Sequence, residues 1–332
     1  MSHYPLRDNL FTDDVEKEPI RAGFGRGLKA AGEANEAIVA LCADLTDSTQ
    51  MGKFKEAFPE RFVEVGVAEQ NLVTVASGMA RAGKIPFTSS YAAFSPGRNW
   101  EQIRTTIALN EQPVKIVGSH AGVSVGPDGA THQMLEDIAL MRVLPHMVVV
   151  VPGDSIEAEK ATRAIAENGK PSYIRLAREK SPIFSTDESP FEIGKAYVLK
   201  HGTDVTLLGT GALSYQLLAA AQELEKHGIN AEVVHVPTIK PLDEKTILQS
   251  ITKTGRAVTA EEAQIAGGFG GAIAELLSEK KPTPLKRIGL YDRFGESGAP
   301  DELLEHFGLT GATIAPVVKS FIESTPQYHR DY

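Results

Sequence analysis

The sequence alternates short apolar, β-branched runs with longer segments of helical periodicity, and this alternation constrains the fold more than any other feature. A strand buried on both faces reads as a continuous apolar run, so the pattern predicts mostly parallel sheets covered by helices on both sides. In the first half we expect strands at 37–42, 62–65, 85–88, 114–119, 147–151 and 172–176, and helices at 20–31, 69–82, 99–108, 135–140 and 155–167.

A segment with two prolines and no helical period, 181–194, is the predicted linker between two domains. The length of 332 residues suits about two domains of roughly 150 residues each. We place the first domain at 1–185 and a second, smaller one at 186–332. The second domain is expected to contain strands at 204–208, 231–236, 256–260 and 286–291, and helices at 215–227, 243–252 and 269–279. The predicted fold class is α/β, with two doubly wound domains.

Charge and cysteine usage narrow the function classes. Thirty-four Lys and Arg residues against 43 Asp and Glu residues give a formal net charge of −9, which disfavours a nucleic-acid or anionic-membrane partner. The single cysteine, Cys42, excludes an intrachain disulfide and is predicted to be a small buried apolar residue. Because the N-terminus is polar and no apolar stretch is long enough to span a bilayer, we expect a cytoplasmic protein.

Two glycine runs lie where a strand passes into a helix, at 209–211 and 267–271. Such runs can cradle a phosphate with backbone amides. The full dinucleotide-binding spacing is missing from both, however, and tight turns need glycine for conformational reasons alone. We therefore interpret both runs as structural.

Three segments combine polar and aromatic side chains just beyond predicted strand ends, which is where α/β sheets form ligand crevices. They are 64–71, with Glu69 at a helix start, 88–98, with two aromatics, and the long loop 118–133. Taken alone, Glu69 is an ordinary complement to a helix dipole, and Phe94 is ordinary core. A polar loop as long as 118–133 is more typical of a functional site. The spacing of its two histidines fits no metal site, so we predict no metal ligands in this chain.

The strings GVAEQN (66–71), TSSYAAF (88–94) and GPDGATHQ (126–133) together resemble the C-terminal half of transketolase. The resemblance runs from about residue 18 to the C-terminus and implies a pyrimidine-binding domain followed by the family's C-terminal domain. The Gly-Asp-Gly motif with which the family holds the diphosphate and its metal is absent; the nearest string is Gly153-Asp154-Ser155. The resemblance therefore implies the C-terminal subunit of a split transketolase, which works with a separate N-terminal subunit that carries the diphosphate and Mg²⁺ or Ca²⁺.

The same resemblance implies roles for individual residues. Glu69 matches the glutamate that hydrogen-bonds N1′ of the aminopyrimidine of thiamine diphosphate, and Phe94 matches the aromatic residue that stacks on this ring. Tyr91 is expected to line the same pocket. The family segment after Phe94 is one residue longer than 95–99, so no role is carried over to Pro96 or Gly97.

Sugar phosphates are the implied substrates, and the implied reaction is reversible transfer of a two-carbon ketol unit from a ketose phosphate to an aldose phosphate. Together with Glu69, His132 is the expected catalytic residue. The assembly implied by the family contains two copies of each chain. The residues expected to bind substrate are Arg21, Ser48, His120, Asp128, His132 and Arg178.

Other interpretations remain open. A 1-deoxyxylulose-5-phosphate synthase shares similar motifs but is normally one chain, and the β subunit of a 2-oxo acid dehydrogenase shares the architecture but is not expected to carry the His132 loop. A transketolase for a branched sugar phosphate is also compatible with the motifs. A non-catalytic scaffold subunit would keep the fold without needing Glu69, Phe94 and the polar loop residues together.

Overall fold

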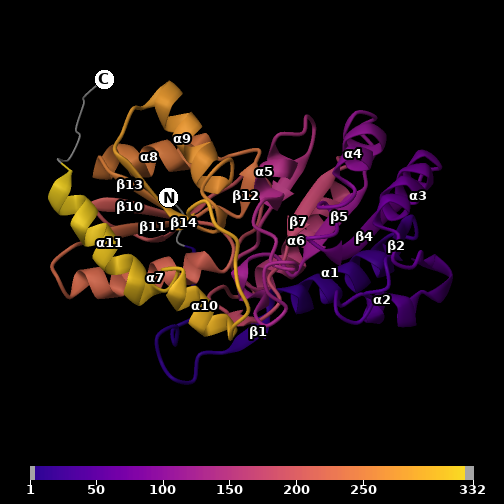
Figure 1. Cartoon of the computed structure of the whole chain (residues 1–332), viewed down its shortest axis with the longest axis horizontal. Helices are drawn as coiled ribbons and strands as arrows, with labels where there is room; N and C mark the ends of the chain where they lie inside the picture. The colour runs from indigo at the N-terminus through magenta and orange to yellow at the C-terminus, as the bar shows by residue number, and fades with distance from the viewer. Residues whose placement is uncertain (1–3, 326–332) are drawn as a thin grey trace.

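The computed structural model describes residues 4–325 and contains two sheets covered by helices (Figure 1). A separate two-stranded antiparallel ribbon is formed by β1 (Lys17–Pro19) and β8 (Lys180–Pro182). The larger sheet has the strand order β12 (Thr238–Lys240), β6 (Val148–Val150), β7 (Ser172–Arg175), β5 (Lys115–Ser119), β4 (Ile85–Tyr91), β2 (Ile38–Cys42) and β3 (Phe62–Glu64). The smaller sheet has the order β14 (Leu285–Leu290), β13 (Ala257–Gln264), β10 (Val205–Gly209), β11 (Ala231–His235) and β9 (Tyr197–Lys200). Among the described residues of these two sheets, only the edge strands are antiparallel to their neighbours: β12 pairs with β6, and β9 pairs with β11. The predicted α/β class with mostly parallel sheets is confirmed.

Strand β2 shows why helices are needed on both faces of the larger sheet. Successive side chains of a strand point to opposite faces, and all five residues of β2 are buried. Ile38 and Cys42 join the core on one face, whereas Val39 and Leu41 join the core on the other. The first face is covered by α1 (Ile20–Ala34), α2 (Gly52–Ala57) and α6 (Ser155–Glu167), and the second by α3 (Glu69–Arg81), α4 (Trp100–Gln102), η2 (Ile103–Ala108) and α5 (Asp137–Arg142).

The smaller sheet is built in the same way and shares a core with the larger one. Val149 of the larger sheet and Leu208 and Val234 of the smaller sheet belong to one continuous hydrophobic cluster. One face of the smaller sheet packs on α8 (Glu244–Thr254) and α9 (Phe269–Lys280), and the other on α7 (Leu213–Glu225), α10 (Pro300–His306) and α11 (Gly311–Ser324). The two domains are therefore packed together and not merely tethered.

The predicted strands and helices are present, with ends shifted by a few residues, but several further elements, most of them short, were not predicted. The missed elements are β1 (Lys17–Pro19), β8 (Lys180–Pro182), β9, β12, α2, α10 and α11. The helix expected at 99–108 becomes π-helical from Ile103 onward. The expected linker begins inside β8 and continues with buried Phe184 and Ser185, so the start of this segment is not a free connection.

A buried polar network joins the two domains. Asp154 accepts hydrogen bonds from the backbone amides of Phe184 and Ser185 at 3.0 and 2.7 Å. His235 Nε2 lies 2.7 Å from Glu157 Oε2, and His235 Nδ1 lies 2.6 Å from Ser214 Oγ. This order of groups resembles a hydrolytic triad, but all three side chains are buried and out of reach of a substrate. The network is structural.

Packing accounts for the glycine run before α9. Glu261 accepts hydrogen bonds from the backbone N–H groups of Phe269 and Gly270, at 2.6 and 2.7 Å, where the helix begins. A Cβ atom at Gly268 would lie 2.2 Å from Glu261 Oε2. In the other run Gly211 adopts φ +59, which favours glycine in the turn from β10 to α7. Both glycine runs therefore have the structural explanation that the sequence indicated.

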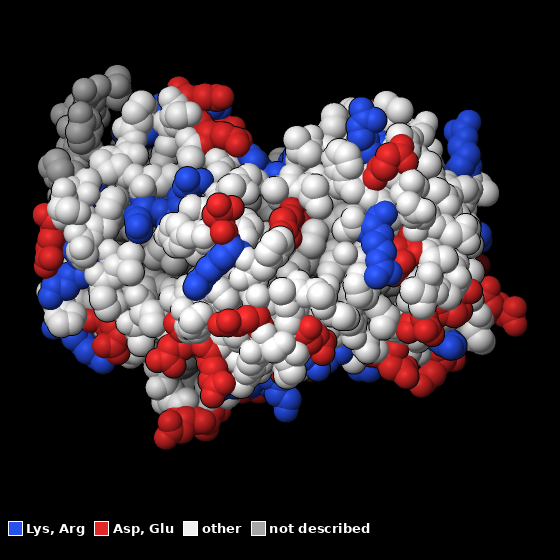
Figure 2. Space-filling model, viewed as in Figure 1, with Lys and Arg blue, Asp and Glu red and all other residues white. Residues whose placement is uncertain are grey.

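The surface carries charges of both signs. On the face drawn in Figure 2, Lys and Arg side chains are interspersed among acidic ones, and acidic side chains gather along its lower edge. Cys42 is buried, with its Sγ 4.0 Å from Thr49 Oγ1. Within residues 4–325, no helix has both the length and the apolar character required to cross a membrane. Residues 1–3 of the polar N-terminus and 326–332 of the second predicted domain lie outside the described residues.

Candidate active site

The predicted site residues gather at the carboxyl edge of the larger sheet. Ser48 follows β2, Glu69 follows β3, Tyr91 ends β4, His120 follows β5 and Arg178 follows β7. Parallel strands place all of these segments at the same edge, so residues distant in the sequence meet there.

Four rings form the centre of this edge. His120 stacks on Tyr91 with ring centroids 3.8 Å apart, and Tyr91 and Phe94 lie nearly parallel with centroids 5.9 Å apart. His132 presents an edge to Phe94 at 5.3 Å. His120 adopts φ +57, a left-handed conformation that is costly for histidine and is often found at functional sites. The second and third predicted segments are thus in direct contact.

Arg98 contacts both Glu69 and Phe94. Arg98 Nη1 lies 3.0 Å from Glu69 Oε1, and the guanidinium carbon lies 4.2 Å from the centroid of the Phe94 ring. The Glu69 side chain is 5% exposed and that of Arg98 is 51% exposed. Asn99 holds the Glu69 backbone, since its Nδ2 donates to the Glu69 carbonyl at 2.8 Å and to Ser95 Oγ at 3.1 Å.

Sequence reasoning gave no role to Arg98 or Asn99. The difference in loop length after Phe94 discouraged any assignment in this segment, and neither residue type is diagnostic alone. The available signal was an arginine four residues after an aromatic residue, in a loop that follows a strand end. The structure shows that this loop brings Arg98 back onto Phe94.

Positive charge surrounds His120. Arg21 Nε donates to the Arg178 carbonyl at 3.1 Å, and Arg21 also donates to the carbonyl of Ser48. Arg178 donates to the Val125 carbonyl at 2.5 Å. Burial, together with the nearby charges of Arg21, Arg178 and His132, lowers the pKa of His120 to about 3. His120 is therefore neutral near pH 7, and it shares a 2.8 Å hydrogen bond with Ser119 Oγ.

The loop that carries Asp128 and His132 is anchored from inside. Gln133 donates to the carbonyls of Val123, Gly126 and Glu296, the last of which belongs to the second domain. His132 is half-buried, and its Nδ1 lies 2.9 Å from Thr131 Oγ1. Asp128 is exposed, and across residues 4–325 its carboxylate has no ion pair. The structure thus places the predicted site residues at one edge of the larger sheet, with Asp128 on an exposed part of its loop.

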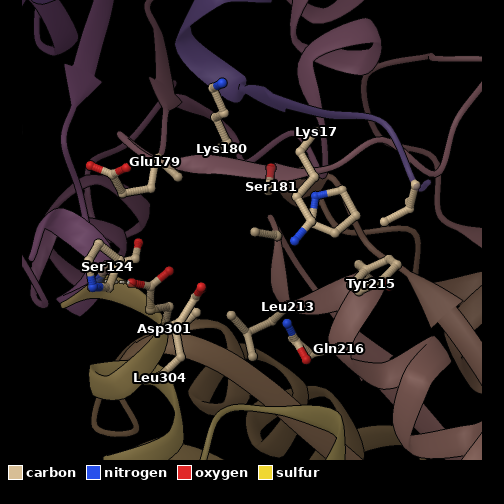
Figure 3. Close-up of a pocket in the computed structure, with 16 residues that line it drawn as sticks. Lys17, Ser124, Glu179, Lys180, Ser181, Leu213, Tyr215, Gln216, Asp301 and Leu304 are labelled. Atoms are coloured by element: carbon tan, nitrogen blue, oxygen red, sulfur yellow. Dashed lines mark hydrogen bonds between the residues drawn. The ribbon is translucent and has the colours of Figure 1, made fainter. Parts of the chain in front are cut away.

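A cavity of about 170 Å³ lies next to this site, between the two domains (Figure 3). Lys17, Lys180 and Ser181 of the β1–β8 ribbon line one side, and Leu213 and Gln216 of α7 line the other. Its walls include chain neighbours of Arg178 and Val125, but none of the predicted site residues. The cavity therefore adjoins the predicted substrate loop from outside and does not coincide with it.

The site residues of this chain suit the aminopyrimidine of thiamine diphosphate but not its diphosphate. A buried carboxylate and an aromatic face that can be reached by one flat group suit a heterocycle with an N–H edge, as the aminopyrimidine expected from the family resemblance has. A diphosphate with its cation needs an oxygen-rich metal site. Among residues 4–325 no group of three or more His, Cys, Asp and Glu side chains is placed to hold a metal ion.

Comparison with known proteins supports the assignment of both domains. Residues 16–182 match the pyrimidine-binding domain of transketolase, and residues 194–314 match the transketolase C-terminal domain. A Methanocaldococcus jannaschii protein named as a transketolase C-terminal section is 46% identical over 89% of this chain and 94% of its own length. A subunit of 6-deoxy-6-sulfo-D-fructose transketolase from a Clostridium species is 44% identical over 92% of this chain and 94% of its own length.

A solved structure is also similar. A split-gene transketolase, described as an inactive β4 tetramer, superposes with a TM-score of 0.86 at 44% identity, and covers 92% of this chain and 98% of its own. The likeness therefore extends over both domains.

Proposed function

The chain belongs to the transketolase family, with the same two domains as its split-gene relatives, and from this membership we propose that it binds the aminopyrimidine of thiamine diphosphate in a two-subunit transketolase. The proposed reaction is reversible transfer of a two-carbon ketol unit from a ketose phosphate to an aldose phosphate. The cofactor, when bound, supplies the thiazolium ring that stores the electron pair of the transferred unit. An N-terminal partner subunit holds the diphosphate and Mg²⁺, and the assembly contains two copies of each chain.

The convergence of Glu69 and Phe94 is the observation that carries this proposal. A nearly buried carboxylate at a helix start and an aromatic ring from another segment meet around one small volume at the sheet edge. A scaffold subunit would have no need for this pairing, because a buried carboxylate costs free energy. The proposed role of Glu69 is to hold a proton at N1′ of the aminopyrimidine, and a positioned acid or base of this kind contributes about 10²–10⁴ in rate.

The histidines and arginines supply the proposed substrate site. His120, neutral near pH 7, can donate a hydrogen bond to a sugar hydroxyl or accept one from it, and His132 faces the same ring cluster. Arg21 and Arg178, with Ser48 beside them, place positive charge where the phosphate of the sugar is proposed to bind. Asp128 is proposed to contact ketose hydroxyls from the exposed loop.

The terminal anion of the sugar separates two substrate classes. The Clostridium relative is named for a sulfonated sugar, so the turnover assay described below should be run with a sugar phosphate and with the corresponding sulfonate. A phosphate carries close to two negative charges at neutral pH and a sulfonate carries one. Because two guanidinium groups lie next to the proposed anion site, we propose the phosphate as the preferred substrate.

The test begins with the tagged chain purified from its own source. We expect native mass spectrometry to show a co-purifying partner with bound thiamine diphosphate, and the same sample to transfer a ketol unit from xylulose 5-phosphate to ribose 5-phosphate. Glu69→Gln keeps the shape of the side chain and is expected to reduce turnover at least about 100-fold with assembly intact. Glu60→Gln, at an exposed position, is the matched control and should leave turnover unchanged.

Three outcomes would contradict the proposal. Full turnover by the Glu69→Gln complex would favour a scaffold role for this chain. Condensation of pyruvate with glyceraldehyde 3-phosphate would indicate a 1-deoxyxylulose-5-phosphate synthase. Oxidative decarboxylation of a 2-oxo acid would indicate the β subunit of a dehydrogenase.

A further inference from the structure

The Arg98 guanidinium touches the same two groups that the proposed function assigns to the aminopyrimidine. It lies over the Phe94 ring at 4.2 Å and donates to Glu69 Oε1 at 3.0 Å. We propose that Arg98 holds the aminopyrimidine position, and that thiamine diphosphate binds by displacing this side chain into solvent. The inference rests on the proposed function, because it needs Glu69 and Phe94 to be the cofactor contacts.

The two groups can substitute for each other chemically. A guanidinium and an aminopyrimidine are both flat, both stack on aromatic faces, and both present N–H groups along one edge. Glu69 Oε1 already accepts a hydrogen bond from Arg98, and the guanidinium lies over the Phe94 ring while it makes this contact. A ring that stacked on Phe94 and bonded to Glu69 in this way would compete with Arg98 for the same volume.

The burial of Glu69 explains why its carboxylate needs the Arg98 guanidinium as a partner when no cofactor is bound. A carboxylate that is 5% exposed loses most of its hydration, and without a partner it would destabilise the fold. Arg98 supplies the opposite charge and a hydrogen bond. Its side chain is half exposed, so the guanidinium can leave toward solvent without opening the core.

The surrounding backbone is held independently of Arg98. A Cβ atom at Gly97 would lie 2.0 Å from the Ala93 carbonyl oxygen, so the chain is tightly packed there. The Arg98 amide donates to the Phe94 carbonyl at 2.9 Å, and Asn99 holds the Glu69 carbonyl. Displacement therefore needs only rotation of the Arg98 side chain and leaves Glu69 in place.

A competing internal ligand weakens the apparent affinity for the cofactor. The measured Kd equals the intrinsic Kd divided by the fraction of molecules in which Arg98 has left the pocket. Removal of the guanidinium should therefore tighten binding. If Arg98 occupies the pocket in most molecules, we expect the Kd of the Arg98→Met complex to fall about 3- to 10-fold.

The experiment is a calorimetric titration of the assembled complex with thiamine diphosphate in magnesium buffer, which needs no turnover. Arg98→Met keeps the length of the side chain without the charge, and Arg98→Lys keeps the charge without the flat donor edge. Arg104→Met removes an exposed arginine from the next helix and is the matched control. Support is a lower Kd for Arg98→Met, a smaller decrease for Arg98→Lys, and no change for the control.

Two results overturn the inference in different ways. If the wild-type complex binds thiamine diphosphate and Arg98→Met binds equally or more weakly, Arg98 does not compete with the cofactor and the proposed function survives. If the wild-type complex does not bind thiamine diphosphate, the proposed function fails and the inference fails with it.

Discussion

Two arginine–carboxylate pairs of the first domain have the same chemistry but different surroundings. Arg175 and Asp137 are 6% and 0% exposed, and Tyr173 also donates to Asp137 at 2.7 Å. Arg98 is 51% exposed, and only one hydrogen bond joins it to the buried Glu69. In the first pair both charges are buried and the geometry is fixed by several partners. In the second pair the Arg98 side chain can move into solvent. We call Arg175–Asp137 the closed pair and Arg98–Glu69 the open pair.

The difference indicates how a protein separates a structural ion pair from an exchangeable one. Arg175 also donates to the Glu262 carbonyl at 2.8 Å and so ties the first domain to the second. Arg98 has no such second anchor among the described residues, apart from the face of Phe94. Loss of the closed pair should therefore lower the free energy of unfolding, and loss of the open pair should mainly change which ligand the pocket binds.

The largest expected effect is on the closed pair. Arg175→Met leaves Asp137 buried without its cation, and we expect it to reduce the free energy of unfolding by about 3–5 kcal/mol. Arg163→Met removes an exposed arginine of α6 and should change this free energy by less than about 0.5 kcal/mol. Urea denaturation followed by circular dichroism measures both. A loss of under about 1 kcal/mol for Arg175→Met would show that the closed pair is not structural.

A smaller effect is expected from the pH dependence of stability. Because the pKa of His120 is about 3 in the folded chain and about 6.5 in the unfolded chain, the unfolded chain binds more protons between these values. Stability should therefore fall as the pH falls through this window. Between pH 7 and pH 5 the contribution of His120 is about 2 kcal/mol.

Replacement of His120 removes this contribution. The variant His120→Gln should lose about 2 kcal/mol less stability than wild type between pH 7 and pH 5, whereas His227→Gln, at an exposed position, should follow wild type. Urea midpoints in phosphate-free buffer provide the measurement, since bound phosphate would change the charge around Arg21 and Arg178. Equal acid sensitivity of His120→Gln and wild type would contradict the assigned pKa.

The larger sheet was largely predictable from the sequence, whereas its edge strand β12 was not. The apolar run of β2 and the stripe on α3 predicted the larger sheet and placed Glu69 at a helix start, because periodicity reports burial directly. Strand β12 was missed because three residues carry no period and their partner, β6, lies in the other domain.

The site was less accessible to prediction than the fold. Motif resemblance proposed Glu69, Tyr91, Phe94 and His120 as site residues, and the structure places all four at one edge of the larger sheet. The left-handed backbone of His120 and the return of Arg98 onto Phe94 depend on loop geometry, which no local pattern encodes. Sequence reasoning therefore predicted which groups meet at this sheet edge, but not the ion pair between Glu69 and Arg98.

The smallest expected effect tests that contact in the isolated chain. A double-mutant cycle with Glu69→Gln and Arg98→Met should give a coupling energy of at most about 1 kcal/mol, because the guanidinium is half exposed and screened by solvent. The corresponding cycle with Asp137→Asn and Arg175→Met should give a clearly larger coupling. Both are measured from urea denaturation of the four proteins in each cycle. Equal coupling energies would mean that Glu69 and Arg98 form a second structural pair. The free energy needed to break this pair would then oppose displacement of Arg98 by a ligand.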